Sequence, residues 1–142
     1  MTTTPCYLTV LKKLTPEQIA ELAPLVEAAN PDDPDVAEAL SENAVIRFEA
    51  IFEGDMPMEM MRWFSTHKIP YLWQWDQFYG TGAGAQFYQA NIDHLHHLRI
   101  HEELCVIPIT QATDKDVVSQ TIDATVELNR LLIGLGLNKK PF

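Results

Sequence analysis

Four of the five histidines in this chain fall between residues 94 and 101, inside the segment DHLHHLRIHEEL. Imidazole side chains titrate near neutral pH and are common metal ligands, so this spacing could serve a metal site or proton transfer. On a helix, His94, His97 and His101 would form one stripe, with the Cβ atoms of His97 and His101 about 6 Å apart. On a strand the same two Cβ atoms would lie about 13 Å apart and could not share a metal ion. The chemistry of the segment therefore depends on its secondary structure.

The sequence supports two conformations of residues 92–103. Asn91 is a good N-cap and Asp93 suits the positive end of a helix dipole, so we favour a helix. The polar–apolar alternation from His97 to His101 is typical of a strand, which we keep as the alternative. In either conformation the segment lacks a third ligand at a recognised spacing and an H-E-x-x-H motif. We therefore expect no cofactor and no tightly bound metal, only weak metal candidates (His94, His97 and His101), and solvated histidines with pKa values at or slightly above about 6.5.

A second candidate site is an aromatic strand. Nine of the thirteen aromatic residues lie between Trp63 and Tyr88. In an extended strand, Tyr71, Trp73 and Trp75 share one face. We predict that this face packs beneath helices. The alternative is a stacking surface for a small ligand.

The acidic residues are concentrated in one part of the chain. The segment from Glu17 to Glu59 contains twelve acidic residues and one basic residue, Arg47, so its net charge is −11 and the rest of the chain sums to +1. Charge runs of this kind are usually solvated, but they also attract basic partners.

One predicted helix arranges part of this charge. It begins at Asp33 as N-cap, with Pro34 as its first residue, and ends near Glu53. At about 100° per residue, five carboxylates fall within roughly 60° of one another along about 27 Å of this helix. They are Asp35, Glu38, Glu42, Glu49 and Glu53. We call this set the acidic ridge and interpret it as a candidate surface for a basic partner.

The remaining patterns predict the elements that position these residues. Thr15 and Gln18 form a capping box for a helix that runs to about Ala29, with Pro24 kinking or splitting it. Further helices are expected at 56–68 and 114–136, and strands at 6–13, 70–79, 85–90 and 104–109. The fold class is α+β, with a helical acidic N-terminal half and a long C-terminal helix packed on a small, largely antiparallel sheet. Residues 1–142 form a single globular domain.

Composition excludes several functions. A net charge of −10 disfavours direct binding of nucleic acid or an anionic membrane. No apolar run approaches the ~20 residues that span a bilayer, and no export signal is visible, so we expect a cytoplasmic protein with reduced Cys6 and Cys105.

We predict a non-catalytic interaction protein, such as an inhibitor, an immunity protein or a nucleic-acid mimic. Its acidic helical face would bind a basic partner, and the sequence is also compatible with a homo-oligomer. One alternative is a small enzyme or metal-binding protein that uses the segment from His94 to His101 beside the aromatic strand. Another is a binder of small ligands that uses the aromatic face.

Overall fold

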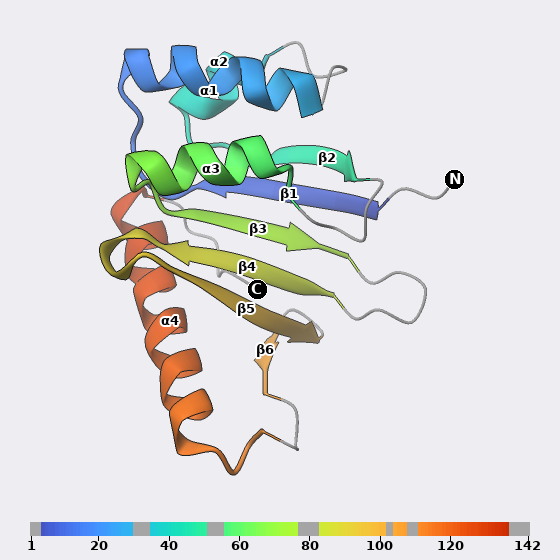
Figure 1. Ribbon diagram of the computed structural model, residues 1–142, viewed down its shortest axis with the longest axis vertical. Coiled ribbons are helices and arrows are strands. Elements are labelled where there is room, and N and C mark those ends of the chain that lie inside the picture. The colour runs from blue at the N-terminus through green and yellow to red at the C-terminus, as the bar shows by residue number, and fades with distance from the viewer. Residues whose placement is uncertain are drawn as a thin grey trace.

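Helices cover both faces of an antiparallel sheet in the computed structural model (Figure 1). The structure describes residues 4–29, 35–50, 56–76, 83–101, 104–107 and 111–136. Within these residues the sheet has six strands in the order β2-β1-β3-β4-β5-β6, and each pair of neighbours is antiparallel. The strands are β1 (Thr4–Val10), β2 (Ile46–Ala50), β3 (Tyr71–Trp75), β4 (Gly84–Gln89), β5 (His94–His101) and β6 (Leu104–Val106). The α-helices are α1 (Pro16–Ala29), α2 (Val36–Ser41), α3 (Met58–His67) and α4 (Lys115–Gly134). This arrangement confirms the predicted α+β class and the long C-terminal helix.

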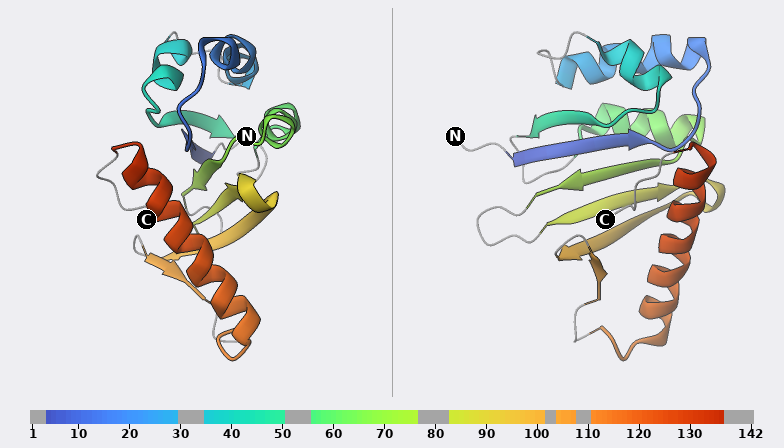
Figure 2. Two further views of the ribbon diagram at one scale, coloured as in Figure 1. Left: turned by 90° about the vertical axis from the view of Figure 1, so that its left-hand side faces the viewer. Right: turned by 180° about the vertical axis from the view of Figure 1, so that it is seen from behind.

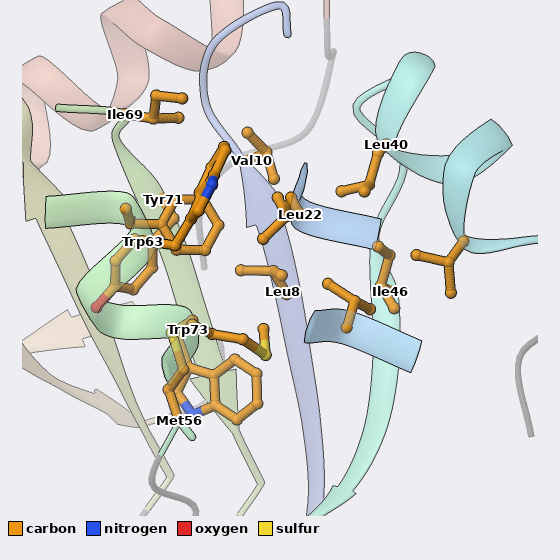
Figure 3. Close-up of a cluster of buried hydrophobic side chains, with 14 of the residues drawn as sticks. Leu8, Val10, Leu22, Leu40, Ile46, Met56, Trp63, Ile69, Tyr71 and Trp73 are labelled. Carbon is orange, nitrogen blue, oxygen red and sulfur yellow. The ribbon is translucent and has the colours of Figure 1, made fainter. Parts of the chain in front are cut away.

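The two faces of the sheet carry separate hydrophobic cores. Helices α1, α2 and α3 cover one face, whereas α4 crosses the strands on the other, as the two views in Figure 2 show. Successive strand residues point to opposite faces, so Leu8 and Val10 join the first core while Leu11 joins the second. Figure 3 shows the first core, in which Leu22 of α1 and Trp63 of α3 lie over the sheet. The second core consists of Leu11, Leu72, Ala85, Phe87, Leu98, Ala124, Leu128 and Leu132.

The predicted capping box begins α1. The Thr15 backbone N–H donates to Gln18 Oε1 at 3.0 Å, and the Gln18 N–H donates to Thr15 Oγ1 at 3.2 Å. Pro24 does not split the helix, which is continuous from Pro16 to Ala29, so of the two predicted effects only a kink stays a prediction. Pro24 is exposed, so the carbonyl that loses its helical donor is near solvent.

The predicted helix from Asp33 to Glu53 is wrong. Helix α2 spans only Val36–Ser41, with Asp35 as N-cap, and the chain then enters β2. Asn43 ends the helix because it adopts a left-handed conformation (φ 53°). Its buried side-chain Nδ2 donates to the carbonyls of Val10 and Lys12, both at 2.9 Å. These bonds tie the end of α2 to the end of β1.

The preferred helix over residues 92–103 is also wrong, because β5 occupies His94–His101. A short 3-10 helix, η1 (Ala90–Ile92), and Asp93 in the left-handed conformation (φ 50°) turn the chain from β4 into β5. Leu98 is buried against α4, and Leu95 packs on the opposite core. Burial of apolar residues on both faces favours the strand over a helix with one apolar stripe.

Candidate functional site

The acidic ridge does not exist as one helical face. Asp35, Glu38 and Glu42 lie at α2 and are exposed. Glu49 lies on β2, and Glu53 is outside the described residues. The predicted exposure is therefore confirmed for three positions, whereas the predicted alignment of all five is wrong, because α2 ends ahead of Glu49.

The structure nevertheless gathers acidic side chains on a two-helix layer. Helices α1 and α2 pack against each other at the outside of the fold (Figure 1). Neither helix contains a lysine or an arginine. Their exposed acidic residues, counted with the N-cap and C-cap of α2, are Glu17, Glu21, Glu27, Asp35, Glu38 and Glu42. We call these six the acidic layer. The acidic character of Glu17, Glu21 and Glu27 is visible in the sequence. Their position beside the carboxylates of α2 follows only from the packing of α1 against α2.

One member of the acidic layer also holds α1 against α3. Glu21 Oε2 lies 3.0 Å from His67 Nε2 and accepts a hydrogen bond from Trp63 Nε1 at 3.1 Å. The other ring nitrogen of His67, Nδ1, lies 2.8 Å from the Trp63 carbonyl oxygen, and the two rings stack at 4.4 Å. Both ring nitrogens of His67 thus face hydrogen-bond acceptors, and these contacts fix the orientation of the imidazole between α1 and α3.

The aromatic strand is structural over most of its length, as predicted. Trp73 and Tyr71 are fully buried, and Trp73 packs against Phe48 with ring centroids 5.1 Å apart. Burial, followed by the neighbouring Tyr88, raises the pKa of Tyr71 to about 12. Trp75 is half-buried, and its indole covers Gly84 of β4 so closely that a Cβ there would lie 2.4 Å from Trp75 Cζ2. Two of the three rings therefore offer no exposed face for a ligand.

The histidines divide between the two faces of the sheet. His94 and His96 lie on the α4 side, in register with Gln89 and Phe87, whereas His97 pairs with Gln86 and points to the other side. Four residues along a strand separate His97 from His101 by about 13 Å, so these two cannot share a metal ion. Among the described residues, no group of three or more His, Cys, Asp or Glu side chains is arranged to hold a metal.

The fold perturbs the titration of His96. Its ring stacks on Phe87 at 5.7 Å, lies 4.5 Å from the His94 ring, and its Nε2 is 2.9 Å from Gln89 Oε1. Partial burial, followed by His94 and His97, lowers the pKa of His96 below its ordinary value of 6.5. The expectation that all these histidines titrate at or above that value is wrong for His96, because the strand half-buries its ring.

A cluster that sequence reasoning missed joins the end of α3 to the β4–β5 turn. Asp93 Oδ1 accepts a hydrogen bond from the Tyr88 hydroxyl at 2.6 Å and lies 3.0 Å from Lys68 Nζ. The hydrogen bond from Tyr88, and then Lys68, lowers the pKa of Asp93. Lys68 and Asp93 both have positive φ, so the ion pair joins two turn residues that no local sequence pattern connects.

A hollow of about 260 Å³ opens beside this cluster. Lys68 and Gln89 line it, together with Glu127 and Arg130 from α4. Each cation there already pairs with a carboxylate of this chain: Lys68 with Asp93, and Arg130 with Glu127. An anionic ligand would have to displace one of these pairs, so the hollow is not built for anion binding.

The fold and these surfaces define an α+β protein whose most distinctive exposed feature is the acidic layer. None of the described helices combines the length and apolar character needed to cross a membrane. Comparisons with protein-family models, with curated proteins and with solved structures gave no match.

Proposed function

We propose that this protein is a non-catalytic binding protein whose acidic layer docks a basic partner. The observation that carries the proposal is the pairing of α1 and α2, two helices that bear only acidic charges on their exposed residues. Natural helices usually interleave lysine or arginine with such carboxylates, because like charges at i,i+4 repel by a few tenths of a kcal/mol. This layer retains the repulsion at Glu38 and Glu42, and a basic partner would relieve it.

The length of the layer suits a partner with several cations. Helix α1 has fourteen residues and is therefore about 21 Å long. This length exceeds the Debye length of about 8 Å at physiological ionic strength, so one cation cannot interact with all the carboxylates at once. A partner with lysines or arginines spread along a helix or an extended segment would do so. We infer a partner of that kind, bound with a strong dependence on salt.

Two other functions remain predictions with less support. An enzyme or metal site at His94–His101 has less geometric support, because β5 sends His97 to the opposite face of the sheet from His94 and His96, whose rings lie 4.5 Å apart. On the aromatic face, Trp75 alone of the three predicted residues is exposed enough to contact a small ligand, since Tyr71 and Trp73 are buried.

The test compares two variants with the same change in net charge. In the first, Glu38→Gln and Glu42→Gln neutralise α2. In the control, Glu59→Gln and Asp76→Asn remove two exposed carboxylates that lie outside the acidic layer, on α3 and directly after β3. Binding of a lysine-rich synthetic peptide is measured by calorimetry at several salt concentrations.

The α2 variant should bind the peptide several-fold more weakly than the control does, with a flatter dependence on salt. Equal weakening by both variants would mean that the peptide responds only to net charge. That outcome would contradict docking on the acidic layer.

A further inference from the structure

Helix α4 has two apolar faces, of which the fold uses one. Ala124, Leu128 and Leu132 are buried in the second core. About 140° away around the helix axis, Ile122, Val126 and Ile133 are 55%, 63% and 76% exposed. A helix that packs on one side only normally presents a polar outer face, so this second apolar stripe needs a separate explanation.

The spacing of the exposed stripe is that of a helix–helix seam. Ser119, Ile122, Val126, Asn129 and Ile133 follow one another at intervals of 3, 4, 3 and 4 residues. This alternation keeps a continuous line on one side of a helix, about 21 Å long from Ser119 to Ile133. Val126 and Ile133, the two β-branched residues seven positions apart, occupy equivalent places in the repeat. We call these five residues the α4 seam.

The two ends of the α4 seam are complementary to each other. At the C-terminal end, Ile133 is 76% exposed, the highest value among the large apolar side chains that the structure describes. At the N-terminal end, an open hollow of about 330 Å³ is lined by Ala112 and by five residues of α4: Lys115, Val118, Ser119, Ile122 and Asp123. The α4 members of this lining surround the same helical face as the seam. A protruding side chain and a hollow at opposite ends of one face fit two copies of the same helix that run antiparallel.

Charges along one flank of the α4 seam have the same self-complementary order. Asp116 lies near the N-terminal end of the flank, Asp123 in the middle and Arg130 near the C-terminal end. Consider an antiparallel pair of α4 helices in which Ile122 faces the second copy's Val126. In this register, Arg130 and the second copy's Asp116 are offset by only about 3 Å along the helix axis. The two Asp123 side chains meet near the two-fold axis, where they repel each other.

We propose that the α4 seam is the interface of a homodimer in which two α4 helices pack antiparallel about a two-fold axis. Each Ile133 enters the other copy's hollow, and Arg130, which pairs with Glu127 of its own chain, is shared with the other copy's Asp116. The interface is isologous, so it closes with two copies. One helix face is a small contact area, so the dimer is weak, with a dissociation constant of roughly micromolar or higher.

Sedimentation velocity of the full chain over a wide concentration range tests the proposal. The wild type should change from monomer to dimer as concentration rises, whereas Val126→Asp should stay monomeric at every concentration. Met58→Asp is the matched control, because Met58 is 70% exposed but lies on α3, across the sheet. It should dimerise like the wild type.

Charge exchange tests the antiparallel arrangement. Arg130→Glu alone should raise the dissociation constant several-fold, because it places like charges opposite each other. Adding Asp116→Arg to that variant should restore association, because it reverses both members of the pair. Asp123→Asn should strengthen the dimer, since it removes the repulsion at the axis.

Three results would overturn the proposal. The first is a wild-type protein that is monomeric at its solubility limit, or that binds a different protein through the seam without self-association. The second is equal behaviour of Val126→Asp and Met58→Asp. The third is failure of the Asp116→Arg, Arg130→Glu variant to regain association. If Val126→Asp does not fold, as judged by circular dichroism, Ile133→Asp replaces it, because that side chain is the more exposed.

Discussion

Asn43 offers a test of how a single residue stabilises the fold, because three of its properties contribute to the free energy of unfolding. It is buried, its backbone is left-handed, and its side-chain amide donates to the Val10 and Lys12 carbonyls at 2.9 Å each. Each hydrogen bond contributes about 1 kcal/mol net, so their loss costs about 2 kcal/mol. An ordinary L-residue with a Cβ pays roughly 1 kcal/mol more in the left-handed region.

Three substitutions separate these contributions. Asn43→Ala should lower the free energy of unfolding by about 3 kcal/mol, because it loses the hydrogen bonds and tolerates the backbone poorly. Asn43→Gly should cost less, about 2 kcal/mol, because glycine adopts positive φ readily but adds entropy to the unfolded chain. Asn43→Asp should cost at least as much as Asn43→Ala, although aspartate tolerates the left-handed region. Its carboxylate cannot donate and would face two carbonyl oxygens in a buried site.

Urea unfolding at neutral pH, followed by circular dichroism, measures all three changes. A loss of less than about 1 kcal/mol for Asn43→Asp would refute the reasoning, since the hydrogen bonds would then contribute little. A loss for Asn43→Gly as large as that for Asn43→Ala would show that backbone strain has no measurable effect.

Three further predictions concern the strands. Trp73→Ala should cost about 3–5 kcal/mol in urea unfolding, since the indole is fully buried in the first core, and an unchanged midpoint would contradict this. Gly84→Ala should displace the Trp75 indole, shift tryptophan emission to longer wavelength and cost about 1–3 kcal/mol, whereas an unaltered spectrum would show that the two residues are not in close contact. The pKa of His96 is lowered in the fold, so the native state favours the neutral ring; stability should fall as pH drops below the ordinary value of 6.5, and His96→Gln should flatten that slope. Equal slopes for the wild type and His96→Gln would contradict the lowered pKa.

The sequence predicted elements well where local signals and periodicity agree. Thr15 and Gln18 make both bonds of the predicted capping box. Helix α4 occupies Lys115–Gly134 within the predicted 114–136, and the Asp114 side chain caps it by accepting from two backbone N–H groups. In such segments the same residues set both the boundary and the buried face, so no long-range information was needed.

The errors arose where a left-handed residue ended an element. Asn43 was read as one more helical position, and the acidic spacing from Asp35 to Glu53 then gave a consistent but false helical face. The alternation of Ile46 and Phe48 with Arg47 and Glu49 was a strand signal that could have corrected it. The helix predicted over the histidine segment failed for a similar reason, because Asp93 adopts a left-handed conformation and the chain enters β5 directly after it. Both residues also have long-range partners that a local sequence pattern does not reveal: Val10 and Lys12 for Asn43, and Lys68 for Asp93.

The separation of the acidic layer from α4 by the sheet has a consequence for binding strength. Helices α1 and α2 lie on one face and α4 on the other, so pairing through α4 would leave both acidic layers exposed. A dimer of this kind would present two acidic layers at a fixed separation. A basic partner with two such segments would bind the second layer intramolecularly, at an effective concentration of roughly millimolar for a short flexible connection. The seam would then raise affinity for repetitive or extended basic partners and leave affinity for a single short basic peptide unchanged. Weak self-association and weak electrostatic docking would in this way combine into selective binding, without either contact being strong by itself.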